Sequence, residues 1–439
     1  MPTPRCLSWA LALLLLLISI PGLAADLESD RSRMKTILDT VSSEIQKHYY
    51  DPAMKGIDWK AKTEEARTKI DRAESVNKML MAIFVLTDSL KDSHTMFVPP
   101  GRLFPPSFGY DALAVGDKVL VTEVKKGGAA EKAGLHLGDE LLSVNGYDAD
   151  RQTFSQMMLF FRASRPVDTL ELEVQRGSEV KKLTVAAEAP VQQQILDVTK
   201  FDTLWQLLRD TGNDEELPYT WSVSHEGIGH LELRSFALSE ETVNNLVSKM
   251  KSARAFIVDL RSNPGGREEA LRNFMGHFDA QINKAADVFG RKGPVPMKIM
   301  PLKPQLTGPI VVLIDSRSAS AAEVLAYHVR FTKRGKVIGD QSAGRLMSAH
   351  ILYEQAGSDA LILYGIEVST GRVVFPDGIN LEGKGVQPDI KCLPTAQEIA
   401  ANHDTCLDLA YKEARKALAS QKPKATPARK KRKVVHKSG

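Results

Sequence analysis

Apolar side chains recur at helical spacing in the first hundred residues. Between Met34 and Ile45 they fall three, four, seven and eleven positions after the first, which places them on one face of a helix. Asp58 and Ser75 stand just before two more stretches of this kind, and both residue types are favoured at helix N-caps. The pattern predicts an N-terminal helical region over residues 26–100.

Strand and helix patterns alternate in the second half of the chain. The aliphatic, β-branched runs at 255–260 and 310–314 are typical of buried strands, and each is followed by a stretch of helix-forming residues. This alternation favours a parallel sheet with helices on its faces, with functional residues after the carboxyl ends of the strands. We expect an α/β core over 191–400 and a last helix from Ala396 to Ala419, most of it in the C-terminal segment 401–420.

A compact unit of a different pattern separates these two regions. Four prolines between residues 99 and 106 mark a linker. Alternating residues at 170–174 are typical of a half-buried strand, and Asn145-Gly146 is typical of a β-hairpin turn. The pattern predicts a separate small domain over residues 105–190.

The two ends of the chain differ in composition from the rest. Residues 1–24 combine Arg5, an uncharged apolar run and a small-residue cleavage pattern, which is typical of a secretory signal peptide. Residues 421–439 carry eight Lys and Arg and no acid, so the formal net charge of +4 comes from this segment. Behind a signal peptide we expect a basic, disordered tail that contacts an anionic surface weakly, and no binding of nucleic acid.

A secretory leader predicts an exported protein, periplasmic or extracellular. Cys392 and Cys406 are the cysteines that follow the leader, and an oxidising compartment would allow a disulfide between them. No spacing of Cys and His is typical of a zinc site, so we expect neither a metal nor a cofactor.

A serine-rich turn follows the predicted buried strand at 310–314. Helix-forming residues begin at Ala321, so Ser318 and Ser320 lie at a helix N-terminus. Free N–H groups and the helix dipole favour negative charge at this place, so a serine here would have an oxyanion site beside it. Alternatively, either serine serves only as the N-cap of the helix.

Four segments together resemble one enzyme family. They are Leu90-Lys-Asp-Ser-His-Thr95, Asp259-Leu-Arg-Ser-Asn-Pro-Gly-Gly266, Ser318-Ala-Ser-Ala-Ala-Glu323 and Glu382-Gly-Lys-Gly-Val-Gln-Pro-Asp-Ile390. Residues 105–190 closely resemble a PDZ domain, and the whole is similar to the C-terminal processing (tail-specific) serine peptidases and their tricorn and interphotoreceptor retinoid-binding relatives.

This resemblance implies an α/β fold: a crotonase-like ββα core with an N-terminal helical region and an inserted PDZ domain. A PDZ domain captures a peptide end as an added strand. In this chain Asp111 lies in the loop that would bind the terminal carboxylate, and its charge opposes such a ligand. The domain is therefore either a receptor or a lid.

The resemblance makes Ser320 the nucleophile, with Ser318 as the alternative. The backbone N–H of Ala321, with that of Gly265 or Gly266, would form the oxyanion hole. Glycine suits this role because backbone without a Cβ can approach the reacting carbonyl.

Arg345 occupies the position at which the tail-specific family has its catalytic lysine. A guanidinium has a pKa above ~12 and cannot accept the serine proton, so we expect Arg345 to bind a substrate carboxylate. The site is then closer to the tricorn-like branch, in which His94 would act as the base and Ser93 and Glu382 would orient it.

Two other residues are reserve candidates: Glu323 as the orienting acid and His350 as the base. A histidine base predicts an acidic limb near ~6.5 in the pH–rate profile. The sequence thus predicts an exported serine endopeptidase that cleaves proteins or peptides near their C-termini through acyl-enzyme chemistry. Without the lysine, the alternative is an inactive peptidase fold that binds peptides or apolar ligands.

Overall fold

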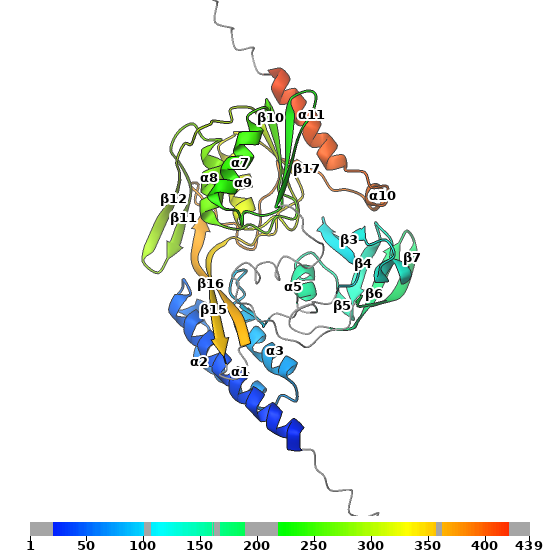
Figure 1. Ribbon diagram of the computed structural model, residues 1–439, viewed down its shortest axis with the longest axis vertical. Helices are drawn as coiled ribbons and strands as arrows, with labels where there is room; N and C mark the ends of the chain where they lie inside the picture. The colour runs from blue at the N-terminus through cyan, green and yellow to red at the C-terminus, as the bar shows by residue number, and fades with distance from the viewer. Residues whose placement is uncertain are drawn as a thin grey trace, which may run out of the picture.

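The computed structural model describes residues 21–100, 107–159, 161, 167–188, 218–356 and 362–420. Most of the predicted leader, part of the linker, the start of the predicted core and the whole basic tail lie outside these residues. Figure 1 shows three parts: N-terminal helices at one end, an α/β core at the other, and a small β domain beside the core. The fold expected from the resemblance is confirmed.

The N-terminal part consists of α1 (Pro21–His48), α2 (Trp59–Asp71) and α3 (Val76–Asp88), with the short η1 (Met54–Gly56) between the first two. Both predicted caps are present: the Asp58 side chain accepts from the Ala61 N–H, and the Ser75 side chain accepts from the Lys78 N–H. The apolar face predicted for the first helix is buried against the other two helices. None of the helices in the described part of the chain has the length and apolar composition of a membrane span.

A six-stranded sheet forms the centre of the core, in the order β17-β14-β13-β10-β9-β8. Its strands are β8 (Tyr219–Val223), β9 (Ile228–Leu233), β10 (Ala255–Asp259), β13 (Ile310–Ile314), β14 (Gly335–Gly339) and β17 (Ile390–Lys391). All neighbours are parallel except β8 and β9. Because β10 and β13 are parallel neighbours in register, with Asp259 opposite Leu313, the segments that follow them emerge side by side.

Helices cover both faces of this sheet (Figure 1). One face packs on α7 (Glu240–Met250), α8 (Glu268–Gly276) and α9 (Ala321–Phe331), and the other packs on α11 (Thr405–Ser420). Side chains alternate between the two faces along each strand: Phe256 and Val258 join the first cluster, and Ala255 and Ile257 join the second. Burial on both faces explains the continuous apolar runs in the sequence.

A second sheet connects the core to the N-terminal helices. It consists of β1 (Met96–Val98), β11 (Asn283–Gly290), β12 (Gly293–Ile299), β15 (Met347–Ala356) and β16 (Ile362–Val374). The long strand β16 pairs with β1 and β11 along one edge and with β15 along the other. It therefore brings the residues just before β1 close to those just before β15.

The small domain is built from a sheet in the order β2-β3-β4-β6-β7, with β5 paired to β4. Its elements are β2 (Tyr110–Val115), β3 (Lys118–Val124), α4 (Ala129–Lys132), β4 (Glu140–Val144), β5 (Tyr147–Asp148), α5 (Phe154–Leu159), β6 (Thr169–Arg176) and β7 (Glu179–Ala186). Asp111, on the edge strand β2, forms an ion pair with Arg317 of the core at 2.5 Å. Ser316 donates to the carbonyl of Ala114 on the same strand at 2.6 Å. The core loop thus contacts β2, the strand that carries the predicted carboxylate-binding loop.

The C-terminal segment differs from the prediction of one continuous helix. It forms α10 (Ala396–Ala400) and α11, because Asn402 takes a left-handed conformation (φ 53°) and Asp404 accepts from the Leu407 N–H at the start of α11. Cys392 and Cys406 form a disulfide with 5.7 Å between their Cα atoms. It fastens the start of α11 to the end of the core sheet.

Candidate active site

Ser320 lies in the tight turn between β13 and α9. It has φ 53° and ψ −116°, a region that a residue with a Cβ rarely adopts. Its N–H donates to the carbonyl of Arg345 at 2.9 Å and to the carboxylate of Glu323 at 3.0 Å. Strained backbone held by surrounding contacts is common where a side chain must be presented to a ligand.

Ser318, the alternative nucleophile, is fully buried. Its Oγ donates to the carbonyl of Leu260 at 2.8 Å and accepts from the N–H of Asp315 at 2.9 Å. These bonds give Ser318 a role in holding the loop that follows β10 against the loop that follows β13. The geometry favours Ser320 as the reactive hydroxyl.

Gly265 lies directly against the turn that carries Ser320, and Gly266 lies against the backbone of Phe236. A Cβ on Gly265 would lie 2.6 Å from the Cβ of Ser320 and 3.0 Å from the N of Ala321. A Cβ on Gly266 would lie 2.3 Å from the carbonyl carbon of Phe236. Both positions also have positive φ, +100° and +143°, so only glycine fits either position.

The backbone donors beside Ser320 are not equivalent. The N–H of Gly265 donates to Oδ1 of Asn263 at 2.8 Å. The N–H groups of Gly266 and Ala321 have no hydrogen-bond partner among the described residues, and that of Ala321 is the first amide of α9. This distinction, which the sequence left open, favours Gly266 over Gly265 as the second donor to an oxyanion.

His94 is the end of a hydrogen-bonded chain of side chains. Its Nδ1 lies 2.7 Å from the Oγ of Ser93, and that Oγ donates to Oε2 of Glu382 at 3.0 Å. A serine hydroxyl has one proton, so Ser93 must accept from the Nδ1–H of His94. The chain therefore fixes the tautomer whose Nε2 carries a lone pair, which is the form that can accept a proton.

Arg345 connects the serine turn to the histidine loop. Its carbonyl accepts from Ser320, while its guanidinium donates to the carbonyl of Ser93 at 2.8 Å. The sequence predicted a contact between this guanidinium and a substrate carboxylate, which stays a prediction.

Burial and the neighbouring Arg345 lower the pKa of His94 to about 3, against an opposing effect of Asp92. With a histidine base of lowered pKa, we expect the acidic limb of the pH–rate profile to lie below ~6.5.

Glu323, the reserve acid, is fully buried, and the hydrogen bonds of its carboxylate go to residues other than His94. Its carboxylate accepts from the N–H groups of Ser320, Gly344 and Arg345 and from the hydroxyl of Ser342. Burial nevertheless raises its pKa to about 7. Glu323 thus holds the loop that carries Arg345 against the serine turn.

Asp92 organises the histidine loop, and the sequence reasoning did not single it out. Its carboxylate accepts from the N–H of His94 at 3.1 Å, the hydroxyl of Thr95 at 3.2 Å and the hydroxyl of Tyr49 at 3.0 Å. The signal was present, since an Asp two residues before a loop residue commonly accepts from that residue's backbone N–H.

Ser320 and His94 do not hydrogen-bond to each other, although Arg345 contacts the backbone of both loops. Nε2 of His94 likewise has no hydrogen-bond partner among the described residues. His350, the reserve base, is exposed on β15. Across the described residues, no group of three or more His, Cys, Asp and Glu side chains is arranged to hold a metal ion.

Comparisons with known families match three parts of the chain. The model for "Peptidase family S41" matches residues 227–392, that for "PDZ domain" matches 95–187, and that for "Tricorn protease C1 domain" matches 31–78. The first match includes Ser320, both glycines and Glu382, and the order of the three matches is that of the three parts of the fold. The chain carries a peptidase family S41 domain.

Curated relatives resemble most of the chain. Carboxyl-terminal-processing peptidase 1, chloroplastic, of Arabidopsis thaliana is 26% identical over 362 residues, which are 76% of this chain and 65% of the relative. Carboxy-terminal processing protease CtpB of Bacillus subtilis is 22% identical over 383 residues, 83% of this chain and 72% of the relative. This chain thus spans roughly two thirds of the length of these relatives.

Solved structures show the same fold. Mature CPAF complexed with lactacystin has a TM-score of 0.60 at 14% identity and covers 89% of this chain and 97% of its own. The photosystem II D1 C-terminal processing protease has a TM-score of 0.50 at 19% identity and covers 84% and 96%.

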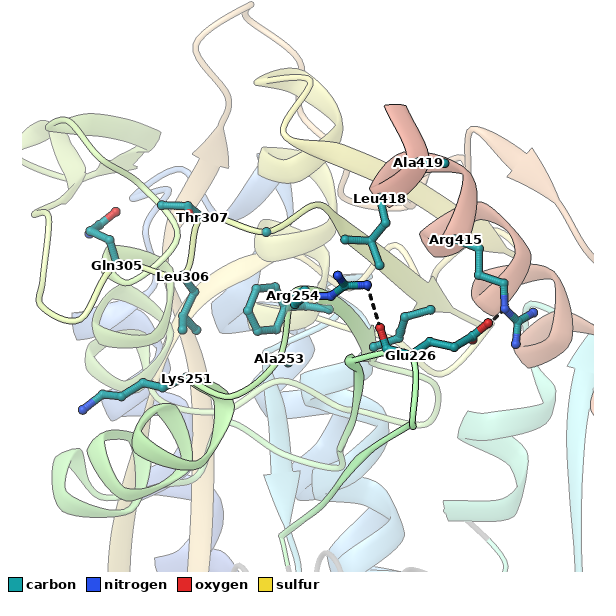
Figure 2. A pocket seen from close by; sticks show the side chains of 13 residues that line it. Glu226, Lys251, Ala253, Arg254, Gln305, Leu306, Thr307, Arg415, Leu418 and Ala419 are labelled. Carbon is teal, nitrogen blue, oxygen red and sulfur yellow. Dashed lines mark hydrogen bonds and ion pairs between the residues drawn. The ribbon is translucent and has the colours of Figure 1, made fainter. Parts of the chain in front are cut away.

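A cavity in the core lies away from Ser320. Figure 2 shows the residues that line this cavity, between the end of α11 and the amino ends of β9, β10 and β13. Its volume is about 1020 Å³. Arg254 donates to the carbonyl of Glu226, whose carboxylate pairs with Arg415 at 2.8 Å. The candidate site, in contrast, follows the carboxyl ends of the same strands.

Proposed function

We propose that the protein is an exported serine endopeptidase in which Ser320 is the nucleophile and His94 is the base. The observation that carries this proposal is the chain from Nδ1 of His94 through Ser93 to Glu382. It leaves Nε2 as a proton acceptor. Ser320 lies at a helix N-terminus, beside backbone N–H groups that have no partner in the part of the chain that the structure describes. These are the parts that acyl transfer needs.

In the proposed reaction, Oγ of Ser320 attacks the scissile carbonyl while its proton passes to Nε2 of His94. The N–H groups of Gly266 and Ala321 donate to the oxyanion that forms. The imidazolium then gives its proton to the leaving amine, and an acyl-enzyme on Ser320 remains. Water deprotonated by His94 attacks the ester, and release of the acid restores Ser320.

Glu382 carries the negative charge that stabilises the imidazolium through Ser93. Its carboxylate also accepts from the N–H groups of Ser93 and Leu346, at 3.1 and 2.6 Å, so its orientation is fixed from both loops. Arg345 then serves as a positioning residue, because its side chain binds the histidine loop while its backbone binds the serine turn.

The substrates are proteins or peptides, and cleavage near their C-termini is our inference from the names of the relatives. The PDZ domain would take part in selecting them. Export is supported by the predicted leader and by the Cys392–Cys406 disulfide, which an oxidising compartment would maintain. The basic tail would keep the enzyme close to an anionic surface.

One observation favours the alternative, an inactive peptidase fold that binds peptides or apolar ligands. Ser320 and His94 are not hydrogen-bonded to each other, and Arg345 stands where the tail-specific family has its lysine. Catalytic hydrogen bonds, however, often form only when substrate binds.

The test is covalent labelling with a fluorophosphonate probe, followed by peptide hydrolysis. We expect the wild-type protein to be labelled and Ser320→Ala and His94→Ala to be unlabelled. His350→Ala, which removes an exposed histidine, is the matched control and should be labelled at the wild-type rate. A folded wild-type protein that is never labelled, yet binds peptides, would establish the alternative.

A further inference from the structure

Glu367 is a half-buried carboxylate that the proposed reaction does not use. It lies in β16 between Ile366 and Val368, both of which pack against the N-terminal helices. Because side chains alternate along a strand, Glu367 points to the opposite face of the sheet. Its carboxylate has no hydrogen-bond partner among the described residues, and a half-buried carboxylate without a partner is costly.

Two apolar side chains flank Glu367 on that face. Met96 of β1 and Ile351 of β15 lie directly opposite it in the sheet register, and both are half-buried. Side chains opposite each other on neighbouring strands have Cβ atoms about 5 Å apart. Met96, Glu367 and Ile351 therefore form a strip across the three strands, with the carboxylate in the middle and an apolar side chain on each side of it.

This strip adjoins the candidate active site through both neighbouring strands. Met96 follows His94 by two residues, and β15 begins two residues after Arg345, whose carbonyl contacts Ser320. Arg345 and Asp92 are the charged groups that act on Glu367: burial and Asp92 raise the pKa of its carboxyl to about 7, and Arg345 opposes them. The positive charge of Arg345 does not fully offset the cost of burying the Glu367 carboxylate. An additional cation beside this carboxylate would therefore be stabilised.

We propose that Glu367 determines specificity by binding a lysine or arginine side chain of the substrate. This inference rests on the proposed function and names the substrate class of the same site. The aliphatic stem of the substrate residue lies between Met96 and Ile351, and its charged head donates to the carboxylate of Glu367. A long cationic side chain matches this arrangement because it combines an apolar stem with a polar end.

The experiment measures binding without catalysis, on the full chain carrying Ser320→Ala. Binding of two sets of fluorescein-labelled peptides is measured by fluorescence anisotropy at pH 8. Each peptide has an uncharged sequence with one variable residue, and the position of that residue differs from peptide to peptide. The variable residue is lysine in one set and norleucine in the other. Norleucine keeps the stem and lacks the charge. We expect lysine at one position to bind about 10-fold to 100-fold more tightly than norleucine there.

Adding Glu367→Gln should abolish this preference, whereas Glu354→Gln is the matched control and should keep it. Glu354 lies on β15 opposite Tyr364, on the face that packs against the helices. Equal binding of the two peptide sets, or a lysine preference that survives Glu367→Gln in a protein with unchanged melting temperature, would overturn the proposal. This result is independent of fluorophosphonate labelling. If the protein were not labelled but preferred lysine peptides, the lysine subsite would stand and the proposed hydrolase activity would be refuted.

Discussion

Substituting Gly265 by alanine tests the packing of the proposed oxyanion site against the nucleophile. The new methyl group would lie 2.6 Å from the Cβ of Ser320 and 3.0 Å from the N of Ala321, one of the two proposed oxyanion donors. Ordinary contacts between carbon atoms are about 3.5–4.0 Å long, so the turn would have to move by about 1 Å. Neither neighbour is the end of a flexible side chain, so the shift must involve backbone.

The expected loss of rate follows from that displacement. Moving a reacting atom by about 1 Å lowers the reaction rate about 100-fold. Disturbing an oxyanion donor lowers it by a further factor of about 10 or more. The backbone of Gly265 also has φ +100°, a conformation that would cost alanine about 1–3 kcal/mol of stability. We expect fluorophosphonate labelling of Gly265→Ala at least about 100-fold slower than that of wild type, with a lower melting temperature.

Gly293→Ala separates strain from steric contact. Gly293 has φ +96°, close to that of Gly265, but a Cβ there would have no neighbour within 4 Å. It should lower stability similarly and leave the labelling rate unchanged. If Gly265→Ala were labelled at the wild-type rate, the Ser320 turn would not be the reactive site, or the two segments would not lie together as described.

Three further predictions concern the base, its orientation and the C-terminal disulfide. Because the positive charge of Arg345 lowers the pKa of His94, Arg345→Met should move the acidic limb of kcat/KM upward from its low wild-type position toward ~6.5; an unmoved limb would exclude His94 as the titrating base. Glu382→Gln should lower kcat by about 100-fold to 10,000-fold with little change in KM, and unchanged kcat in a folded variant would remove Glu382 from the site. Replacing Cys392 and Cys406 by serine should lower the free energy of unfolding in urea by about 3 kcal/mol, since the bond closes a short loop; equal stability of oxidised and reduced wild-type protein would contradict this.

The core and the serine turn were largely predictable from the sequence because their signals are local. Continuous apolar runs at β10 and β13 predict strands buried on both faces, and caps such as Asp58 mark helix starts directly. The predicted last helix was too long, because its periodicity continues across Asn402 and only the backbone conformation there shows the break.

The details of the site depend on contacts between distant segments, which no local pattern specifies. Ser93 and Glu382 are 289 residues apart, and only the resemblance to a family brought them together before the structure did. The side chain of Asn263 engages the amide of Gly265, and the low pKa of His94 depends on burial and on Arg345. Glu367 has no motif at all, since its position is defined only by the register of β1, β16 and β15.

The pairing of Ser320 with His94 can be tested most directly with a peptidyl chloromethyl ketone. In a serine peptidase this reagent forms a hemiketal with the serine Oγ and alkylates the Nε2 of the catalytic histidine, so one molecule joins both groups. We predict that peptide mapping of the inactivated wild-type protein will find the alkylated residue to be His94, and that Ser320→Ala will not be alkylated there. Alkylation of another residue, or of His94 at the same rate without the Ser320 hydroxyl, would contradict a Ser320–His94 catalytic pair.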